Sequence, residues 1–284
     1  MPLLGRRLEE AFFKWLMIAS LALVLCTLAA IVMVIAYRGA PALSLSMVTQ
    51  IPKGGYYLGG GGGVANAIVG SLYLSLGATV LSILLSLPIA FALQKEYMSR
   101  SLAHITRIVL DILWGIPSIV YGAFGFIIMA YFGLTASLLG GIVALTLLMT
   151  PIMTRAMEEV ISMIPIELKE ISYAMGATRL ETTLRVVLRQ ALPGIVTAVL
   201  LAFGRGIGDA ASILFTAGYT DHIPRSLFDP VASLPLAVFF QIGTPVPAVQ
   251  DRAYASALIL LLIVLLIIVI SRLLSLRFSK HIVR

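Results

Sequence analysis

An arginine and an aspartate stand four residues apart inside a long apolar run, residues 192–217. A helix would place Arg205 and Asp209 one turn apart on the same face, with Arg205 near the middle of the run. Its guanidinium group matches a phosphate-like oxyanion in charge and in fork geometry. Two interpretations stay open: the pair neutralises itself and staples a helix, or Arg205 meets a passing oxyanion while Asp209 holds and releases the guanidinium.

Arg155 is the second candidate, because it follows Pro151 at the end of another apolar run, residues 138–154. Near a membrane interface it could line a path or extend harmlessly toward water. The single cysteine, Cys26, excludes a disulfide framework and a cysteine metal site. The five glycines 59–63 lack the Gly-Lys-Ser/Thr ending of a nucleotide loop. We therefore expect no catalytic residue, metal or cofactor in this chain.

The composition indicates the class of protein that must position these residues. Of the 284 residues, 60% are hydrophobic and 12% are charged, and the mean hydropathy is +1.04. A soluble domain carries roughly 25% charged residues, and disorder needs the reverse balance. The net charge of +7 comes from short basic clusters between apolar runs, so no nucleic-acid partner is expected. The chain is predicted to be an integral membrane protein.

Six apolar runs are long enough to cross a hydrocarbon core about 30 Å thick, which takes roughly 20 helical residues. Every backbone polar group in lipid must bond internally, so the runs are predicted to be helices and the fold class all-α. The expected spans are residues 15–36, 67–93, 108–132, 138–154, 192–217 and 255–274. Residues 1–14 form a segment before the transmembrane domain, residues 15–284.

The distribution of positive charge tests this topology. Most of the 20 lysines and arginines precede the first run, lie between the second and third, or follow the fourth and sixth. The other side holds Arg38, Lys53, Arg225 and Arg252. By the positive-inside rule, both termini and the loop 155–191 are predicted to be cytoplasmic. The first run is longer than the 7–15 residues of a signal-peptide core, so we expect it to be retained.

Two long segments fall on the outer side. Residues 39–66 contain the glycine run, which resists helix and strand and is expected to form a flexible hinge before the second helix. Residues 218–254 form an outer loop with an apolar stretch, 233–242, that is too short to span. That stretch is predicted to lie against the outer interface or to re-enter partway.

The cytoplasmic loop predicts a helix, a glycine turn and a second helix. Pro165 suits the first helical position, Gly176 the left-handed residue that ends a helix, and Thr178 with Glu181 a capping box. The turn would expose an apolar knob suited to a partner's groove, although a solvated surface loop is the alternative. The knob consists of Tyr173, Ala174, Met175 and Leu180.

The same loop resembles the coupling loop of ABC importer permeases. Glu170-Ile171-Ser172, three residues, Gly176, nine residues and Val186-Val187-Leu188 are similar to that family's pattern, with Arg189 where proline is usual. The resemblance implies that the loop docks into an ATPase subunit and transmits its motion. The coupling residues it implies are Glu170, Tyr173, Ala174, Met175, Gly176 and Ala177.

Further motifs resemble the smaller membrane subunit of phosphate ABC importers. They are AIVGS at 67–71, DILWGIPSIVYG at 111–122, Pro151 with Arg155, LPGI at 192–195 and LFTA at 214–217. The family pattern Arg-x-x-Gly-Glu-Thr-Ala appears at 205–211, with Asp209 for Glu and Ala210 for Thr.

The resemblance implies a type I ABC importer permease in the cytoplasmic membrane of a prokaryote, a subunit that is not an enzyme. Its implied partners are a second homologous permease, two ABC ATPases that bind the ATP, an extracytoplasmic phosphate-binding protein and the lipid membrane. A permease for sulfate, molybdate or phosphonate is an alternative. An ion-coupled transporter or channel is less favoured, and an intramembrane enzyme is weaker still.

Overall fold

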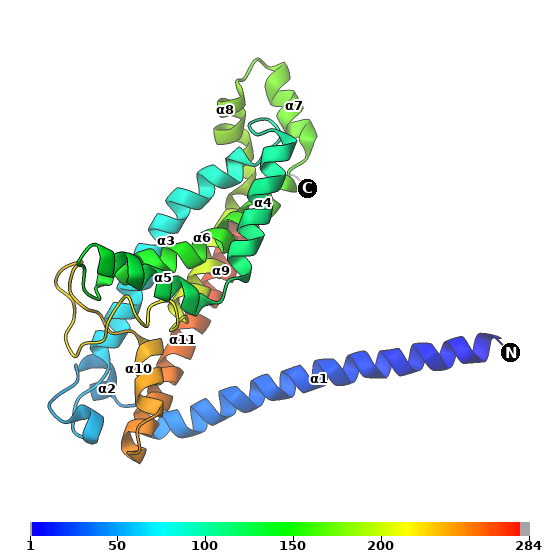
Figure 1. Ribbon diagram of the computed structural model, residues 1–284. Helices are drawn as coiled ribbons and strands as arrows, with labels where there is room; N and C mark the ends of the chain where they lie inside the picture. Colours follow the sequence, from blue (N-terminus) through cyan, green and yellow to red (C-terminus); the bar gives the residue numbers. More distant parts are fainter. Residues whose placement is uncertain (1, 279–284) are drawn as a thin grey trace.

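The computed structural model describes residues 2–278, and within them every regular element is helical (Figure 1). The elements are α1 (Pro2–Ala42), α2 (Leu45–Thr49), the 3-10 turn η1 (Tyr56–Leu58), α3 (Ala65–Ala92), α4 (Arg100–Gly115), α5 (Ser118–Tyr131), α6 (Leu138–Ser162), α7 (Ile166–Ala174), α8 (Arg179–Thr182), the π-helical turn η2 (Thr183–Val187), α9 (Leu188–Ile207), α10 (Leu234–Ile242) and α11 (Pro247–Phe278).

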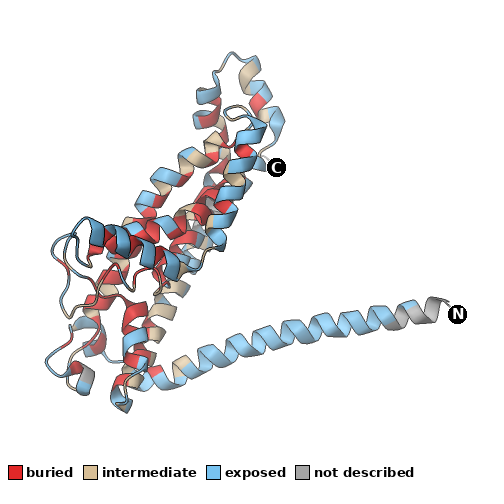
Figure 2. Cartoon of the chain, in the orientation of Figure 1, coloured by how far each residue is buried: buried red, intermediate tan, exposed pale blue. Residues whose placement is uncertain are grey.

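Helix α6 forms the centre of the bundle and packs against α3, α9, α4 and α5 (Figure 2). Met149, Met153, Met157 and Ile161 recur every four residues along it, and each is fully buried. Glycines bring α9 close to this stripe: a Cβ atom at Gly206 would lie 2.6 Å from the Met149 sulfur. Small residues thus allow the close helix packing that membrane bundles use.

Five helices are long and apolar enough to span a membrane, and a bent pair, α4 and α5, makes a sixth. The six expected spans are therefore present if that pair counts as one broken span. Helix α3 reproduces the predicted second span within two residues at each end. The helices of the first, fourth and sixth spans, α1, α6 and α11, extend past their apolar runs. A helix can continue beyond the hydrocarbon core where its polar residues still favour helical structure.

The prediction of a single straight helix over residues 108–132 for the third span is wrong. The chain bends by 96° between α4 and α5. Pro117 has no N–H and disfavours helical geometry in the residue before it, and Ile116 is accordingly extended, with φ −68° and ψ 130°. Helix α5 therefore runs across the bundle instead of along it (Figure 1).

The fifth span is wrong at its end, since α9 stops at Ile207 and not at residue 217. The Asp209 carboxylate accepts a 2.8 Å hydrogen bond from the N–H of Ser212, which competes with helical bonding. Residues 208–217 form irregular turns, and part of their backbone is paired, for example through the bond from Ser137 N to the Thr216 carbonyl. Irregular backbone at membrane depth needs such internal partners.

The outer end is more closely packed than expected. The glycine run wraps around Arg252, which donates to the carbonyls of Gly59 and Gly60 and lies 4.5 Å from the centre of the Tyr56 ring. It is a packed turn and not a free hinge. Helix α10 likewise packs inward on α3 and α11, and the side chains that anchor it are fully buried: Leu234, Leu236 and Ala237.

Helix α1 diverges from the rest of the bundle (Figures 1 and 2). It meets α11 near Gly39, where a Cβ atom would lie 2.6 Å from the Tyr254 carbonyl oxygen, and Arg38 lies over the Tyr254 ring. The 18-residue apolar window of α1 is 0% buried. Its apolar surface is thus uncovered by the described part of this chain.

Candidate functional site

A helical hairpin projects from the end of the bundle formed by α6 and α9 (Figure 1). We call residues 165–187 the coupling hairpin, after the coupling loop that its sequence resembles. Its local structure follows the sequence prediction. Gly176 ends α7 with φ +86°, and the Thr178 hydroxyl and Glu181 carboxylate form both bonds of the capping box. Pro165 is the N-cap residue of α7, one position before the first helical position that the sequence predicted for it.

The hairpin tip presents apolar side chains to its surroundings. Met175 is 84% exposed and Leu180 61% exposed. Beside them lies a groove of about 550 Å³ between α7 and η2. Of the expected coupling residues, Glu170, Ala174, Met175 and Gly176 are exposed, and Tyr173 and Ala177 are half-buried. Burial raises the pKa of the Tyr173 hydroxyl above its usual value.

The base of the hairpin is held by the turn between α3 and α4, residues 93–99. Lys169 on α7 pairs with the Glu96 carboxylate at 3.0 Å, and Arg179 donates to the Glu96 carbonyl at 2.7 Å. The Tyr97 and Thr183 hydroxyls are 2.7 Å apart. Burial alone would raise the pKa of Glu96, but the hydrogen bond and charge of Lys169 outweigh it, and this pKa is lowered.

Four ionised side chains join α4 to α6; we call them the inner charge network. Glu158, whose side chain is 6% exposed, accepts from Arg107 and from Arg155, each at 2.6 Å. Arg155 also donates to Asp111 at 2.8 Å. A cavity of about 440 Å³, lined by Trp114 and by two members of the network, Arg155 and Glu158, opens beside it. Arg155 thus has two carboxylate partners and is not simply extended toward water.

The expected pair of Arg205 and Asp209 is not formed. Arg205 is exposed in the last turn of α9, where its positive charge interacts favourably with the helix dipole. Within residues 2–278 its side chain has no ion-pair or hydrogen-bond partner. Asp209 is buried beyond the helix end and bonds the Ser212 backbone. Arg155, Arg205 and Asp209 are therefore not gathered into one site.

The comparisons with known proteins decide the family. Residues 82–284 match the family described as "Binding-protein-dependent transport system inner membrane component". The chain belongs to this family. It is accordingly a multi-pass transport component of the cytoplasmic membrane, with the helical architecture described above.

The relatives of this membrane component include phosphate transport system permeases. PstA 1 of Mycobacterium tuberculosis is 37% identical over 202 residues, which are 70% of this chain and 65% of that protein. PstA of Yersinia pestis is 33% identical over 223 residues, 78% of this chain and 75% of that protein. The match thus spans just under two thirds of the length of the mycobacterial relative.

A solved structure supports the same fold for this membrane component. The MetNI methionine ABC transporter in an inward-facing conformation superimposes with a TM-score of 0.62, covering 76% of this chain and 95% of that chain at 20% identity. The chain therefore has the type I ABC importer permease fold.

Sequence reasoning missed the buried ionic residues of this membrane component. Glu158 and Lys169 look like ordinary solvated charges in the sequence. One signal was available for the network: Arg107 and Asp111 at i, i+4 and Arg155 and Glu158 at i, i+3 put opposite charges at the inner ends of two consecutive spans.

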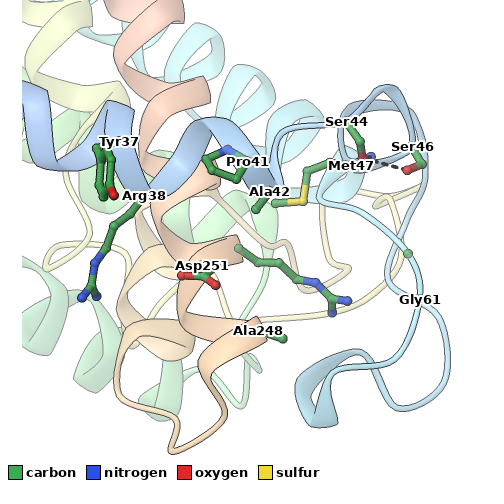
Figure 3. Close-up of a pocket in the computed structure, with 12 residues that line it drawn as sticks. Tyr37, Arg38, Pro41, Ala42, Ser44, Ser46, Met47, Gly61, Ala248 and Asp251 are labelled. Carbon is green, nitrogen blue, oxygen red and sulfur yellow. Dashed lines mark hydrogen bonds between the residues drawn. The ribbon is translucent and has the colours of Figure 1, made fainter.

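The opposite, outer end of the membrane component carries a cavity of about 710 Å³ (Figure 3). It is lined by α1, the segment after it and the start of α11, and Arg38 and Asp251 bring opposite charges to it. The Ser44 and Ser46 hydroxyls bond each other at 2.8 Å on its rim. Residues of α1, of the glycine run and of the start of α11 thus face one cavity at the outer end.

Proposed function

We propose that this chain is the phosphate-translocating permease subunit of an ATP-driven importer, and that the coupling hairpin receives the motion of a partner ATPase. The hairpin carries the proposal: it is rigidly capped, projects from the bundle and exposes Met175 and Leu180. Exposed apolar residues gathered at one tip favour a partner surface. Phosphate is supported by the names of the curated relatives, which are phosphate transport permeases.

In the coupling step, an ATPase groove takes the hairpin tip. Met175, Ala174 and the Gly176 turn supply the apolar contact, and Glu170 supplies a charge on the exposed face of α7. Tyr173 and Ala177 lie deeper and support the tip. ATP is bound and hydrolysed by the partner, and this chain supplies the lever and the path.

For the substrate path, Arg205 is favoured over Arg155. Its guanidinium group is exposed and keeps all its donors for an oxyanion, whereas Arg155 already bonds two carboxylates. Asp209 has its own backbone partner, so its proposed task is to hold the turn after α9 beside Arg205. A permease for sulfate, molybdate or phosphonate has the same general chemistry and is the second candidate.

The partners follow from two surfaces. Helix α1, whose apolar window is uncovered, is proposed to pack on the second, homologous permease subunit. The coupling hairpin is one of two such levers, each facing one of two ABC ATPases. The outer end, with its loop 218–254, faces an extracytoplasmic phosphate-binding protein.

The test is ATP-driven uptake of radiolabelled phosphate into proteoliposomes that hold this chain, its co-purified partners and the binding protein. Excess unlabelled sulfate, molybdate and phosphonate serve as competitors. Uptake blocked by cold phosphate alone supports the proposal. Uptake of a different oxyanion overturns the substrate, and the absence of an ATPase among the co-purified partners overturns the importer assignment.

A further inference from the structure

Two consecutive residues of the α3–α4 turn contact three successive parts of the coupling hairpin. The Glu96 carboxylate pairs with Lys169 on α7, and the Glu96 carbonyl accepts from Arg179, the first residue of α8. The Tyr97 hydroxyl bonds Thr183, the first residue of η2. The turn therefore holds both arms of the hairpin, although it lies 73 to 86 positions away in the sequence.

The ion pair in this contact is shielded from water. The Lys169 side chain is 11% exposed and the Glu96 side chain 22% exposed. Lysine is rarely buried without a partner, because an isolated ammonium group loses its hydration. The pair thus fixes α7 against the turn in one arrangement, which a fully solvated surface pair would not do.

The other side of the turn is tied to the membrane helices. Arg107 on α4 donates to the Leu93 carbonyl at 3.1 Å and to Glu158 on α6 at 2.6 Å. Leu93 is itself 1% exposed. A continuous series of polar contacts therefore runs from the coupling hairpin, through the turn, to the inner charge network.

We propose that Glu96 and Tyr97 are positioning residues for transport, which carry the displacement of the coupling hairpin into α4 and the inner charge network. The proposal rests on the coupling role stated above and goes beyond it. The covalent chain leads from the hairpin only into α6 and α9, and the turn adds a route into α4. We call the contacts of Glu96 and Tyr97 with the hairpin the clamp. Packed elements move as bodies when they are joined on both sides, so the clamp makes α4 follow the hairpin.

The experiment compares variants of the full reconstituted complex, with the ATPase partners and binding protein present. Two quantities are measured in the same vesicles: phosphate imported per ATP hydrolysed, and the stimulation of ATP hydrolysis by the binding protein. The variants are Lys169→Glu, Glu96→Lys and the double exchange. Tyr97→Phe deletes one hydroxyl and serves if the charge variants fail to assemble. Lys95→Gln is the matched charge control, because Lys95 is exposed on the same turn and, within residues 2–278, its side chain has no hydrogen bond or ion pair with the hairpin.

Each single reversal is expected to lower import per ATP about tenfold, within the usual range of coupling between sites. The double exchange restores most of it, Tyr97→Phe lowers it less, and Lys95→Gln leaves it unchanged. Normal ratios in the assembled single variants overturn the clamp. The clamp is also overturned if the single variants lose ATPase binding and the double exchange does not restore it, because the turn would then only shape the docking surface.

Failure of the proposed function has a different signature. If the wild-type complex carries another oxyanion, stimulation by the binding protein still reads out the clamp. If no ATPase accompanies the wild-type chain, the proposed function fails and the clamp falls with it. If the binding protein stimulates ATP hydrolysis equally in the wild type and in every variant, the clamp is overturned and the proposed function stands.

Discussion

Glu158 on α6 and Arg107 on α4 are joined by a 2.6 Å ion pair across 51 residues of sequence. The carboxylate is nearly buried, and its second oxygen bonds Arg155. Removing one member of a buried group of charges leaves the others uncompensated, which costs more than the pair contributes. This contact therefore keeps the two helices at a fixed separation on the side of the bundle that carries the coupling hairpin.

Glu158→Gln is expected to destabilise the protein, because it leaves two guanidinium groups without their shared carboxylate. Both arginines are about a third exposed, which reduces the cost to roughly 2–3 kcal/mol. In detergent this lowers the melting temperature by about 5–10 °C. Glu159→Gln, at the exposed neighbouring position, is the control and should melt like the wild type. Equal melting of the two variants would contradict the prediction.

A second prediction concerns pH and the pair of Glu96 and Lys169. The pKa of Glu96 is lowered from 4.5, so its contribution to stability is complete above pH 4.5 and is lost as the pH falls through the lower folded value. The melting-temperature gap between wild type and Glu96→Gln should be constant from pH 7 to pH 4.5 and close below it. A gap that stays constant to pH 3, or widens, contradicts this sign.

The third prediction tests the hairpin turn. Gly176 has φ +86°, a conformation that a β-branched residue adopts only with strain of about 1–3 kcal/mol. Gly176→Val should therefore disturb the tip, weaken ATPase co-purification and lower import per ATP. Gly54→Val is the matched control, since a Cβ atom there meets nothing within 4 Å and φ is not positive. A fully coupled Gly176→Val complex refutes the lever.

These features differ in how far the sequence alone predicted them. The hairpin was predictable because its signals are local: Gly176 and the Thr178–Glu181 capping box act within a few residues. Four of the six spans were placed correctly by hydropathy, because a long apolar run favours transfer of a helix into lipid. The bend at Pro117 was not, because many membrane helices tolerate proline when neighbours satisfy the freed backbone groups.

Ion-pair partners that lie far apart in the sequence could not be predicted from it, for a different reason. Lys169 finds Glu96 across 73 positions, and nothing in either local sequence favours one carboxylate over another. The end of α9 shows the same limit. Residues 208–217 are as apolar as the helix before them, so only the bond between Asp209 and the Ser212 backbone reveals that the helix has stopped.

The last prediction concerns Arg205, whose exposed guanidinium group is proposed to meet the substrate. Arg205→Ala removes charge-assisted hydrogen bonds worth about 1.5–3 kcal/mol, so phosphate uptake should fall roughly 10- to 100-fold. Arg205→Lys keeps the charge but loses the fork geometry and should fall between wild type and alanine. Arg272→Ala, at an exposed position near the far end of α11, is the control. Assembly is checked by co-purification of the ATPase subunits and is expected to be normal in all three variants. If Arg205 served only the helix dipole, Arg205→Ala would lower the melting temperature slightly and leave uptake intact, and the path would have to be sought elsewhere.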